Sequence, residues 1–248
     1  MYRFFVDKNQ IAEHRVTITG PDVNHIKNVL RMKIGEEVSV MASGDDNEYR
    51  CVIAGFTDDE VELDLIFVKA SNVELPCHIT LFQGLPKADK MELIIQKAVE
   101  LGASEIVPVA TQRAVVKLDK NKEDKKLARW NGISEAAAKQ AKRAYIPSVT
   151  NVKSFAEAVK YCSDYEMKLI PYELSDPDSM EKTRQLMGSI KAGDRVAIFI
   201  GPEGGFTEEE IGLARSSGAV PITLGHRILR TETAGFTVLS WLVLMLDN

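Results

Sequence analysis

A chain of 248 residues, 45% of them hydrophobic, can bury one large core or two modest ones, and we expect two domains. Three widely spaced cysteines without a CxxC pair and four histidines without ligand spacing argue against a disulfide framework and against a bound metal. The formal net charge of −5 argues against general attraction of nucleic acid, and a charged N-terminus without a signal-peptide core favours a cytoplasmic protein.

Short segments with a period of two occupy the first part of the chain. Val38 and Val40 alternate with polar neighbours, and so do Val61 and Leu63, which is the pattern of strands with one buried face. A helical turn is expected at residues 23–30. Many short strands in so few residues predict a small β-barrel. The expected strands are residues 2–6, 15–19, 37–41, 49–56 and 61–67.

The hydrophobic pattern changes around residues 69–76. Strands and helices alternate after this point, which is typical of an α/β domain with a mainly parallel sheet, and we place the two domains at residues 1–72 and 73–248. An apolar run at residues 236–246 is far shorter than the roughly 20 residues that span a bilayer, so we expect a buried helix, in the core or at a subunit interface, and no membrane association. The expected strands are residues 78–85, 106–110, 167–172, 197–200 and 221–224, and the expected helices are residues 91–101, 123–143, 155–162 and a helix from about 234.

Positive charge is concentrated in one segment. Residues 113–143 carry ten Lys and Arg against four Asp and Glu, whereas residues 1–72 carry eight against thirteen. A local phosphate-binding face and a solvated helix face both fit this distribution.

One glycine-rich loop joins an apolar strand to a helix. It reads Ile200-Gly-Pro-Glu-Gly-Gly-Phe206 and leads to Thr207, an expected helix N-cap that forms a capping box with Glu210. Its glycines allow positive φ and close approach of the backbone to a ligand, although a tight turn without a ligand has the same pattern. The carboxylate of Glu203 fits either contact with a ligand or simple stabilisation by the helix dipole.

A second loop follows another strand near the C-terminus. It reads Leu224-Gly-His-Arg-Ile-Leu-Arg-Thr-Glu-Thr-Ala234 and combines glycine with several charged residues. Open α/β folds bind ligands where the carboxyl ends of parallel strands meet, so both loops are expected to converge there.

Together the two loops resemble the knotted methyltransferases of the SPOUT superfamily, and most closely the bacterial family that methylates N3 of a uridine in 16S ribosomal RNA. The resemblance extends over essentially the whole chain, through residues 29–35, 90–102 and 135–140. Two departures from the family pattern stand out: His226 replaces a usual proline, and Ala141 and Lys142 replace a small residue and a glycine.

The resemblance implies a PUA-like β-barrel that helps to bind RNA, followed by a SPOUT-like domain with a C-terminal trefoil knot. In that knot residues 227–234 thread behind residues 201–205. It also implies S-adenosylmethionine as methyl donor, a homodimer with the C-terminal helix at its interface, and 16S ribosomal RNA in the small ribosomal subunit as partner. The expected cofactor-binding residues are Tyr172, Ile200, Gly201, Glu203, Gly204, Gly205, Leu224, Gly225, Ile228, Leu229, Arg230, Thr233 and Ala234.

Methylation at N3 of uracil requires loss of the imide proton. We expect Arg230 to stabilise the negative charge that develops on the base, and Glu232, or a water that it orients, to take the proton. A non-catalytic RNA-binding or ribosome-assembly protein is the alternative. An enzyme with another nucleotide cofactor is disfavoured because no G-x-G-x-x-G or P-loop pattern occurs. The expected phosphate contacts are Arg3, Arg31, Lys33, Arg113, Lys117, Lys139, Lys142 and Arg143.

Overall fold

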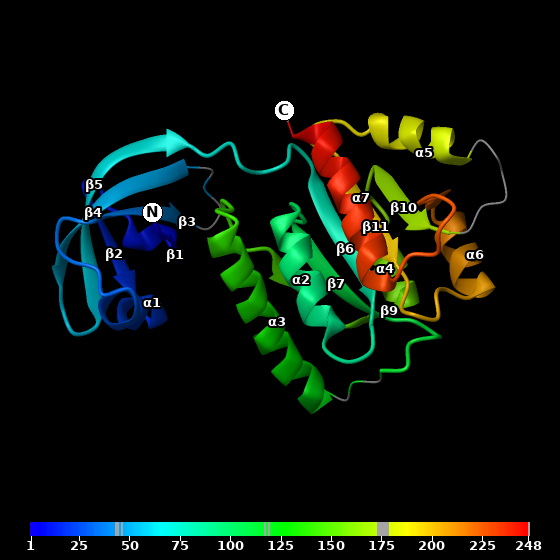
Figure 1. The fold of residues 1–248 in the computed structure, drawn as a ribbon, viewed down its shortest axis with the longest axis horizontal. Helices are drawn as coiled ribbons and strands as arrows, with labels where there is room; N and C mark the ends of the chain where they lie inside the picture. Colours follow the sequence, from blue (N-terminus) through cyan, green and yellow to red (C-terminus); the bar gives the residue numbers. More distant parts are fainter. Residues whose placement is uncertain (43–44, 46, 117, 119, 173–178, 248) are drawn as a thin grey trace. The chain divides into compact units, whose positions relative to one another are not determined.

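The computed structural model describes residues 1–42, 45, 47–116, 118, 120–172 and 179–247 (Figure 1). Its contacts divide the chain into two compact units. The first unit comprises Met1–Glu74 and Ala138–Ile146, and the second comprises Leu75–Ala137 and Pro147–Asn248. The segment Ala138–Ile146 therefore packs with the first unit, although its sequence continues the helical pattern of the residues before it.

The first unit is built on a curled five-stranded sheet. Its hydrogen-bonded order is β1-β3-β4-β5-β2, with β1 parallel to β3 and the other pairs antiparallel, so the sheet has edges at β1 and β2 rather than closing as a barrel along this path. Val61 and Leu63 are buried and alternate with less buried neighbours in β5, which confirms the predicted single buried face there. In β3, between β1 and β4, Ser39 and Met41 are buried as well as Val38 and Val40, so the prediction of one buried face was wrong for this strand. The elements are β1 (Arg3–Val6), η1 (Lys8–Gln10), β2 (Arg15–Thr19), α1 (Pro21–Asn24), η2 (His25–Val29), β3 (Glu37–Ala42), β4 (Asn47–Phe56) and β5 (Glu60–Ala70).

The second unit is an α/β layer structure with a seven-stranded sheet. Every strand pair is parallel, in the order β12-β10-β11-β6-β7-β8, with β9 also paired to β7. This confirms the expected mainly parallel sheet. The strands are β6 (His78–Gly84), β7 (Glu105–Ala110), β8 (Ser148–Val149), β9 (Lys153–Ser154), β10 (Met167–Pro171), β11 (Arg195–Ile200) and β12 (Val220–Ile222).

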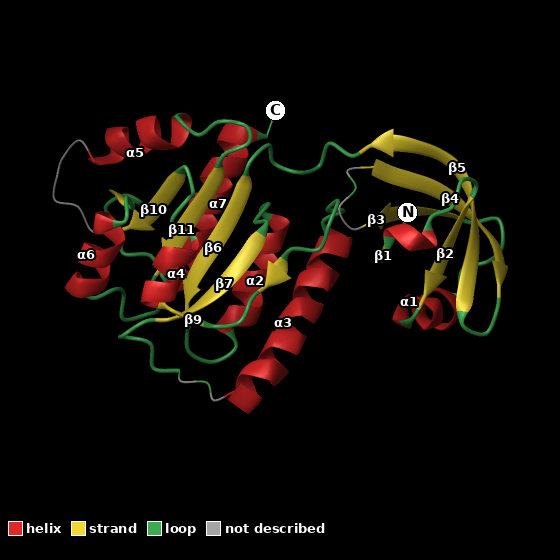
Figure 2. Ribbon diagram, turned by 180° about the vertical axis from the view of Figure 1, so that it is seen from behind, coloured by secondary structure: helices red, strands yellow, loops and turns green. Residues whose placement is uncertain are grey.

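Helices cover both faces of this sheet. The pair α2 and α7 lies on one face, and α4 and α6 lie on the other, as the two opposite views show (Figures 1 and 2). On the α4 side the core contains Phe82 stacked on Phe199, with ring centroids 4.6 Å apart, and Phe155 beside Phe206. The helices are α2 (Lys90–Glu100), α3 (Lys120–Gln140), α4 (Phe155–Tyr161), α5 (Ser179–Gly188), α6 (Glu208–Ser216) and α7 (Thr231–Leu246).

The N-termini of α6 and α7 follow the two loops that were singled out in the sequence. The capping box of α6 is confirmed, because the Thr207 hydroxyl accepts a hydrogen bond from Glu210 N at 3.2 Å and Thr207 N donates to the Glu210 carboxylate at 2.9 Å. Helix α7 begins at Thr231, three residues earlier than expected, with Arg230 as an extended N-cap. Among the described residues no helix is both long and apolar enough to cross a membrane.

Candidate active site

The two loops leave the sheet at one edge. Strands β10 and β12 are paired in parallel with Pro171 opposite Ile222, and β11 and β6 are paired with Ile200 opposite Gln83. All four strands therefore end at the same edge. Strands β6 and β11 are neighbours in the sheet. The chain continues from β6 to β7 on one side and from β11 to β12 on the other side, so the boundary between β6 and β11 is a switch point in strand order. Open α/β sheets bind ligands at such a point.

The first loop folds tightly across the end of β6. A Cβ atom added to Gly84 would lie 2.6 Å from Pro202 Cδ, and one added to Gly201 would lie 3.1 Å from Gly205 Cα. Gly205 has a φ of 67°, a left-handed conformation that favours glycine. The glycines are thus required by close backbone approach as well as by the turn.

A buried chain of hydrogen bonds joins the first loop to the start of α7. Gln83, which is 0% exposed, donates from Nε2 to the Thr231 hydroxyl at 2.8 Å, and this hydroxyl donates to the Gly201 carbonyl oxygen at 2.6 Å. Gln83 was not singled out in the sequence, although an amide inside an apolar strand was a usable signal. The two loops, thirty residues apart at these positions, therefore meet in space.

An ionic contact joins the same two segments nearer the surface. Lys90 Nζ lies 3.1 Å from Glu203 Oε1 and 3.3 Å from Glu232 Oε2. The amide nitrogen of Lys87 also donates to the Glu203 carboxylate, at 3.2 and 3.3 Å. Burial opposes ionisation of Glu203, but backbone hydrogen bonds and Lys90 outweigh it and hold the pKa of this carboxyl below its usual value. The hydrogen bond to Glu203 is the main cause of the raised pKa of Lys90.

The second loop exposes an apolar side chain. Ile228 is 96% exposed. Gly225 has a φ of 100°, and Arg230 is exposed at the N-cap of α7. His226, where a proline was expected, is exposed as well.

The thirteen expected cofactor-binding residues lie in the two loops or at the ends of the elements next to them. Ile200 ends β11, and Tyr172 is exposed directly after β10. The first loop carries Gly201, Glu203, Gly204 and Gly205; the second carries Leu224, Gly225, Ile228, Leu229 and Arg230; Thr233 and Ala234 follow in the first turn of α7.

One expected RNA-binding residue of the second unit lies against the first loop. Arg113 Nη1 donates to the Gly204 carbonyl oxygen at 3.1 Å, and a Cβ added to Gly204 would lie 3.0 Å from Arg113 Cβ. Arg113 is otherwise exposed. Lys117, another expected contact, lies outside the described residues.

Two expected phosphate contacts of the first unit are buried instead. Arg3 is 8% exposed, pairs with Glu48 at 2.9 Å, and donates to the carbonyl oxygens of Lys142 and Arg143. Arg143 is 3% exposed and donates from Nε to the Glu74 carboxylate at 2.8 and 2.9 Å. Buried guanidinium groups that face carboxylates are not available to a phosphate, so the expectation for Arg3 and Arg143 was wrong.

The remaining basic residues of the first unit differ in their availability. Lys139 pairs with Asp22 at 2.8 Å, whereas Arg31, Lys33 and Lys142 are exposed. Lys142 has a φ of 57° and ends α3 in a Schellman turn, in which its amide donates to Lys139 O and the next amide donates to Ala138 O. This conformation explains why a glycine is usual at this position in the family.

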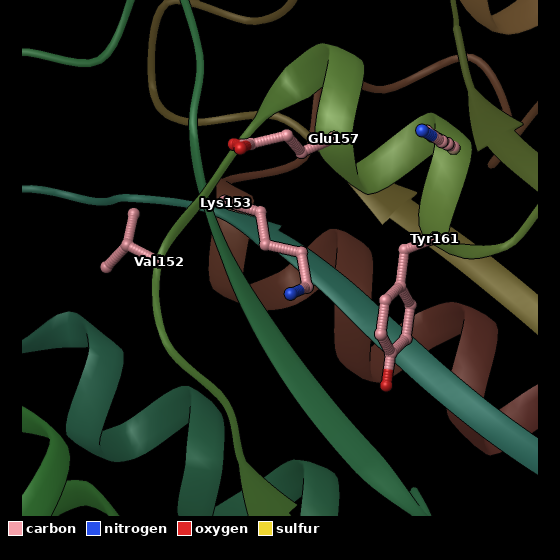
Figure 3. A pocket seen from close by; sticks show the side chains of 5 residues that line it. Val152, Lys153, Glu157 and Tyr161 are labelled. Carbon is pink, nitrogen blue, oxygen red and sulfur yellow. The ribbon is translucent and has the colours of Figure 1, made fainter.

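A surface pocket of about 390 Å³ lies elsewhere in the second unit, along α4 and β9 (Figure 3). Lys153 Nζ lies over the Tyr161 ring at 4.7 Å, and Glu157 completes the capping box of α4, so these polar groups have partners within the unit. The lining includes no residue of the two loops, and we do not assign the site to it. Within the described ranges, no group of three or more His, Cys, Asp or Glu residues is placed to hold a metal ion.

Known proteins resemble this chain over nearly its whole length. The RNA methyltransferase domain family matches residues 73–243, and the RNA methyltransferase PUA domain family matches residues 18–66. Ribosomal RNA small subunit methyltransferase E of Bacillus subtilis is 38% identical over 244 residues, which cover 97% of this chain and 95% of the relative.

Two solved structures with bound cofactor have the same fold. A putative methyltransferase from Legionella pneumophila, in complex with S-adenosylmethionine, has a TM-score of 0.84 and 32% identity, and the match covers 98% of this chain and 97% of that one. A ribosomal RNA small subunit methyltransferase E from Neisseria gonorrhoeae, bound to S-adenosylmethionine, has a TM-score of 0.82 and 29% identity, with 99% and 98% covered.

Proposed function

Because this chain belongs to the ribosomal RNA small subunit methyltransferase E family, we propose that it transfers a methyl group from S-adenosylmethionine to N3 of a uridine in 16S ribosomal RNA. The observation that carries the proposal is the hydrogen-bonded chain from Gln83 through Thr231 to Gly201. It holds two strand-end loops together at the switch point of a parallel sheet, where a nucleotide-like ligand binds in open α/β folds.

The residues at this edge fit S-adenosylmethionine. Its adenine needs an apolar surface, and the exposed side chain of Ile228, with Leu224 and Leu229 beside it in the loop, supplies one. Its ribose and methionine parts need hydrogen-bonding groups, which the glycine-rich backbone of residues 201–205 can present without steric hindrance. When bound, the cofactor supplies an electrophilic methyl group on a sulfonium.

Two side chains at the start of α7 suit the chemistry of N3 methylation. Arg230 is exposed at the N-cap, where its guanidinium can stabilise the negative charge that the uracil carbonyl oxygens acquire as N3 loses its proton. Glu232 lies in the first helical turn with its carboxylate next to Lys90. We assign it the role of proton acceptor, directly or through a water.

RNA binding is proposed for both units. We assign residues 1–72 to an RNA-binding domain and residues 73–248 to the catalytic domain. The exposed residues Arg31, Lys33 and Lys142 in the first unit, and Arg113 in the second, provide cations for phosphates. Such contacts orient the RNA without specifying its sequence. A paired target uridine leaves its stack, and one in an irregular loop needs less disruption.

The proposal includes a homodimer and a trefoil knot. Helix α7 exposes Leu244, at 82%, and Met245, and the neighbouring helix α2 exposes Leu93. Exposed apolar side chains on two packed helices are suited to an interface with a second copy. In the knot, residues 227–234 pass behind residues 201–205, and the contact between Thr231 and Gly201 supports this arrangement. Its ribosomal substrate places the enzyme in the cytoplasm.

The test is transfer of labelled methyl from S-adenosylmethionine to small ribosomal subunits that lack the modification. We expect label in N3-methyluridine after nuclease digestion of the 16S RNA. Absence of label from uridine, with intact RNA binding and no binding of S-adenosylmethionine in calorimetry, would instead identify a non-catalytic RNA-binding protein.

A further inference from the structure

We propose that Lys90 is a positioning residue that fixes the distance between the two loops of the active site by pairing with one carboxylate from each. The inference deepens the proposed function and rests on it. Its basis is geometric: Lys90 Nζ lies 3.1 Å from a carboxylate oxygen of Glu203 in the first loop and 3.3 Å from one of Glu232 in the first turn of α7.

The position of Lys90 in its own helix does not explain its presence. Lys90 is the first residue of α2, and a cation at a helix N-terminus is disfavoured by the helix dipole. A basic residue here gains its stabilisation from elsewhere, and the two carboxylates supply it. The helix itself is firmly anchored, because Met91, Ile94 and Ile95 are buried and α2 packs against α7.

The turn before α2 is held by the same contact. The amide of Lys87 donates to Glu203, and Ala88 has a φ of 54°, a left-handed conformation that costs energy in a residue with a side chain. The carboxylate of Glu203 therefore fixes the turn from one side while Lys90 fixes the carboxylate from the other. The lysine is 30% exposed, and the carboxylates of Glu203 and Glu232 are 29% and 15% exposed, so solvent screens the pairs only in part.

Loss of the ammonium would do more than remove an attraction. Both carboxylates lie within 3.3 Å of the same nitrogen, so they would repel each other once the lysine is neutral. We expect the first loop and the first turn of α7 to separate, which would displace Glu232 and Arg230 from the reacting base. Lys90 acts in this way through the groups it holds and does not itself touch the reacting atoms.

The experiment compares Lys90→Met, Lys90→Arg and a matched control, Lys97→Met. Lys97 belongs to the same helix, about two turns further along, and pairs with Glu100 of that helix at 2.7 Å. The first readout is hydrogen–deuterium exchange of the cofactor-free protein. We expect Lys90→Met to accelerate exchange at residues 201–206 and 228–233 at least fivefold, Lys90→Arg to restore most of the protection, and Lys97→Met to leave it unchanged.

The second readout is calorimetric binding of S-adenosylhomocysteine. We expect Lys90→Met to weaken binding about tenfold, Lys90→Arg to recover most of the affinity, and Lys97→Met to bind like the unaltered protein. Equal weakening of binding by Lys97→Met, unchanged exchange in the two loop segments, or equal acceleration in the first unit's strand at residues 37–42 would overturn the inference.

These outcomes separate the inference from the proposed function. If the unaltered protein transfers no methyl group to ribosomal RNA while Lys90→Met still loosens both loop segments selectively, the proposed function fails and the positioning role stands. If methyl transfer is observed and Lys90→Met leaves loop exchange unchanged, the positioning role fails and the proposed function stands.

Discussion

The substitution Thr231→Val tests whether the buried hydrogen bonds hold the two loops together. Valine keeps the shape of threonine but can neither accept from Gln83 Nε2 nor donate to the Gly201 carbonyl oxygen. The Gln83 amide keeps its second bond, to Gly84 O at 2.9 Å, so the main loss falls on the carbonyl. A buried polar group left without a partner costs about 1–3 kcal/mol, and we expect unfolding to require about 2 kcal/mol less free energy.

The assay is thermal unfolding together with calorimetric binding of S-adenosylhomocysteine. A loss of about 2 kcal/mol lowers the Tm of a chain of this size by roughly 4–8 °C. Because the same bond aligns the loops, the Kd should rise about tenfold, which corresponds to about 1.4 kcal/mol. The control is Thr237→Val on the same helix, where the hydroxyl only donates to the exposed Thr233 carbonyl oxygen. If Thr231→Val and Thr237→Val have the same effect, the bridge does not organise the site.

Three further outcomes are expected. Replacing Lys142, whose φ is 57°, with glycine should raise the free energy of unfolding by about 0.5–1 kcal/mol while weakening RNA binding in a filter-binding assay, and Lys142→Asn should show the same loss of affinity. Arg3→Met should cost about 1–3 kcal/mol in urea unfolding, because it removes the Arg3 hydrogen bonds to Glu48 and to two buried carbonyl oxygens, while Glu48 keeps Arg50 at 2.9 Å. Burial opposes ionisation of Glu48, but hydrogen bonding and Arg3 outweigh it and lower the pKa of this carboxyl. The ionised carboxylate therefore stabilises the fold above its unfolded pKa, and this stabilisation is lost as the pH falls through the lower, folded pKa. If Arg3→Met leaves the decline of stability at acid pH unchanged, this reasoning is contradicted. Arg230→Ala should abolish turnover with a modest change in cofactor affinity, whereas Gly204→Val should impair cofactor binding, and the reverse result would show that the two roles are misassigned.

The sequence predicted the elements of the fold where a period was strong. Alternation at Val61 and Leu63 identified a strand that is buried on one face, whereas the strand of Val38 and Val40 was located correctly but is buried on both faces. The hydrophobic pattern could not show at which residue a helix passes from one compact unit to the other. Residues 138–140 continue the period of α3 without interruption, yet they pack with the first unit, because packing depends on neighbours that are distant in the sequence.

The same limit applies to the charged residues. Arg143 belongs to the basic segment and Arg3 to the acidic first part of the chain, but their partners Glu74 and Glu48 are many residues away, so charge counting could not reveal that either is buried. The loops themselves were recognisable from glycine spacing. Gln83, which joins them, was missed because it lies within an apolar strand, although a polar amide at such a position was a usable signal.

The central claim is that both loops enclose one ligand, and a crystal structure with S-adenosylhomocysteine tests it most directly. We predict that the ligand contacts residues 201–205 on one side and residues 224–230 on the other. A ligand that contacts a single loop, or that occupies the separate pocket beside Lys153 and Tyr161, would contradict the account.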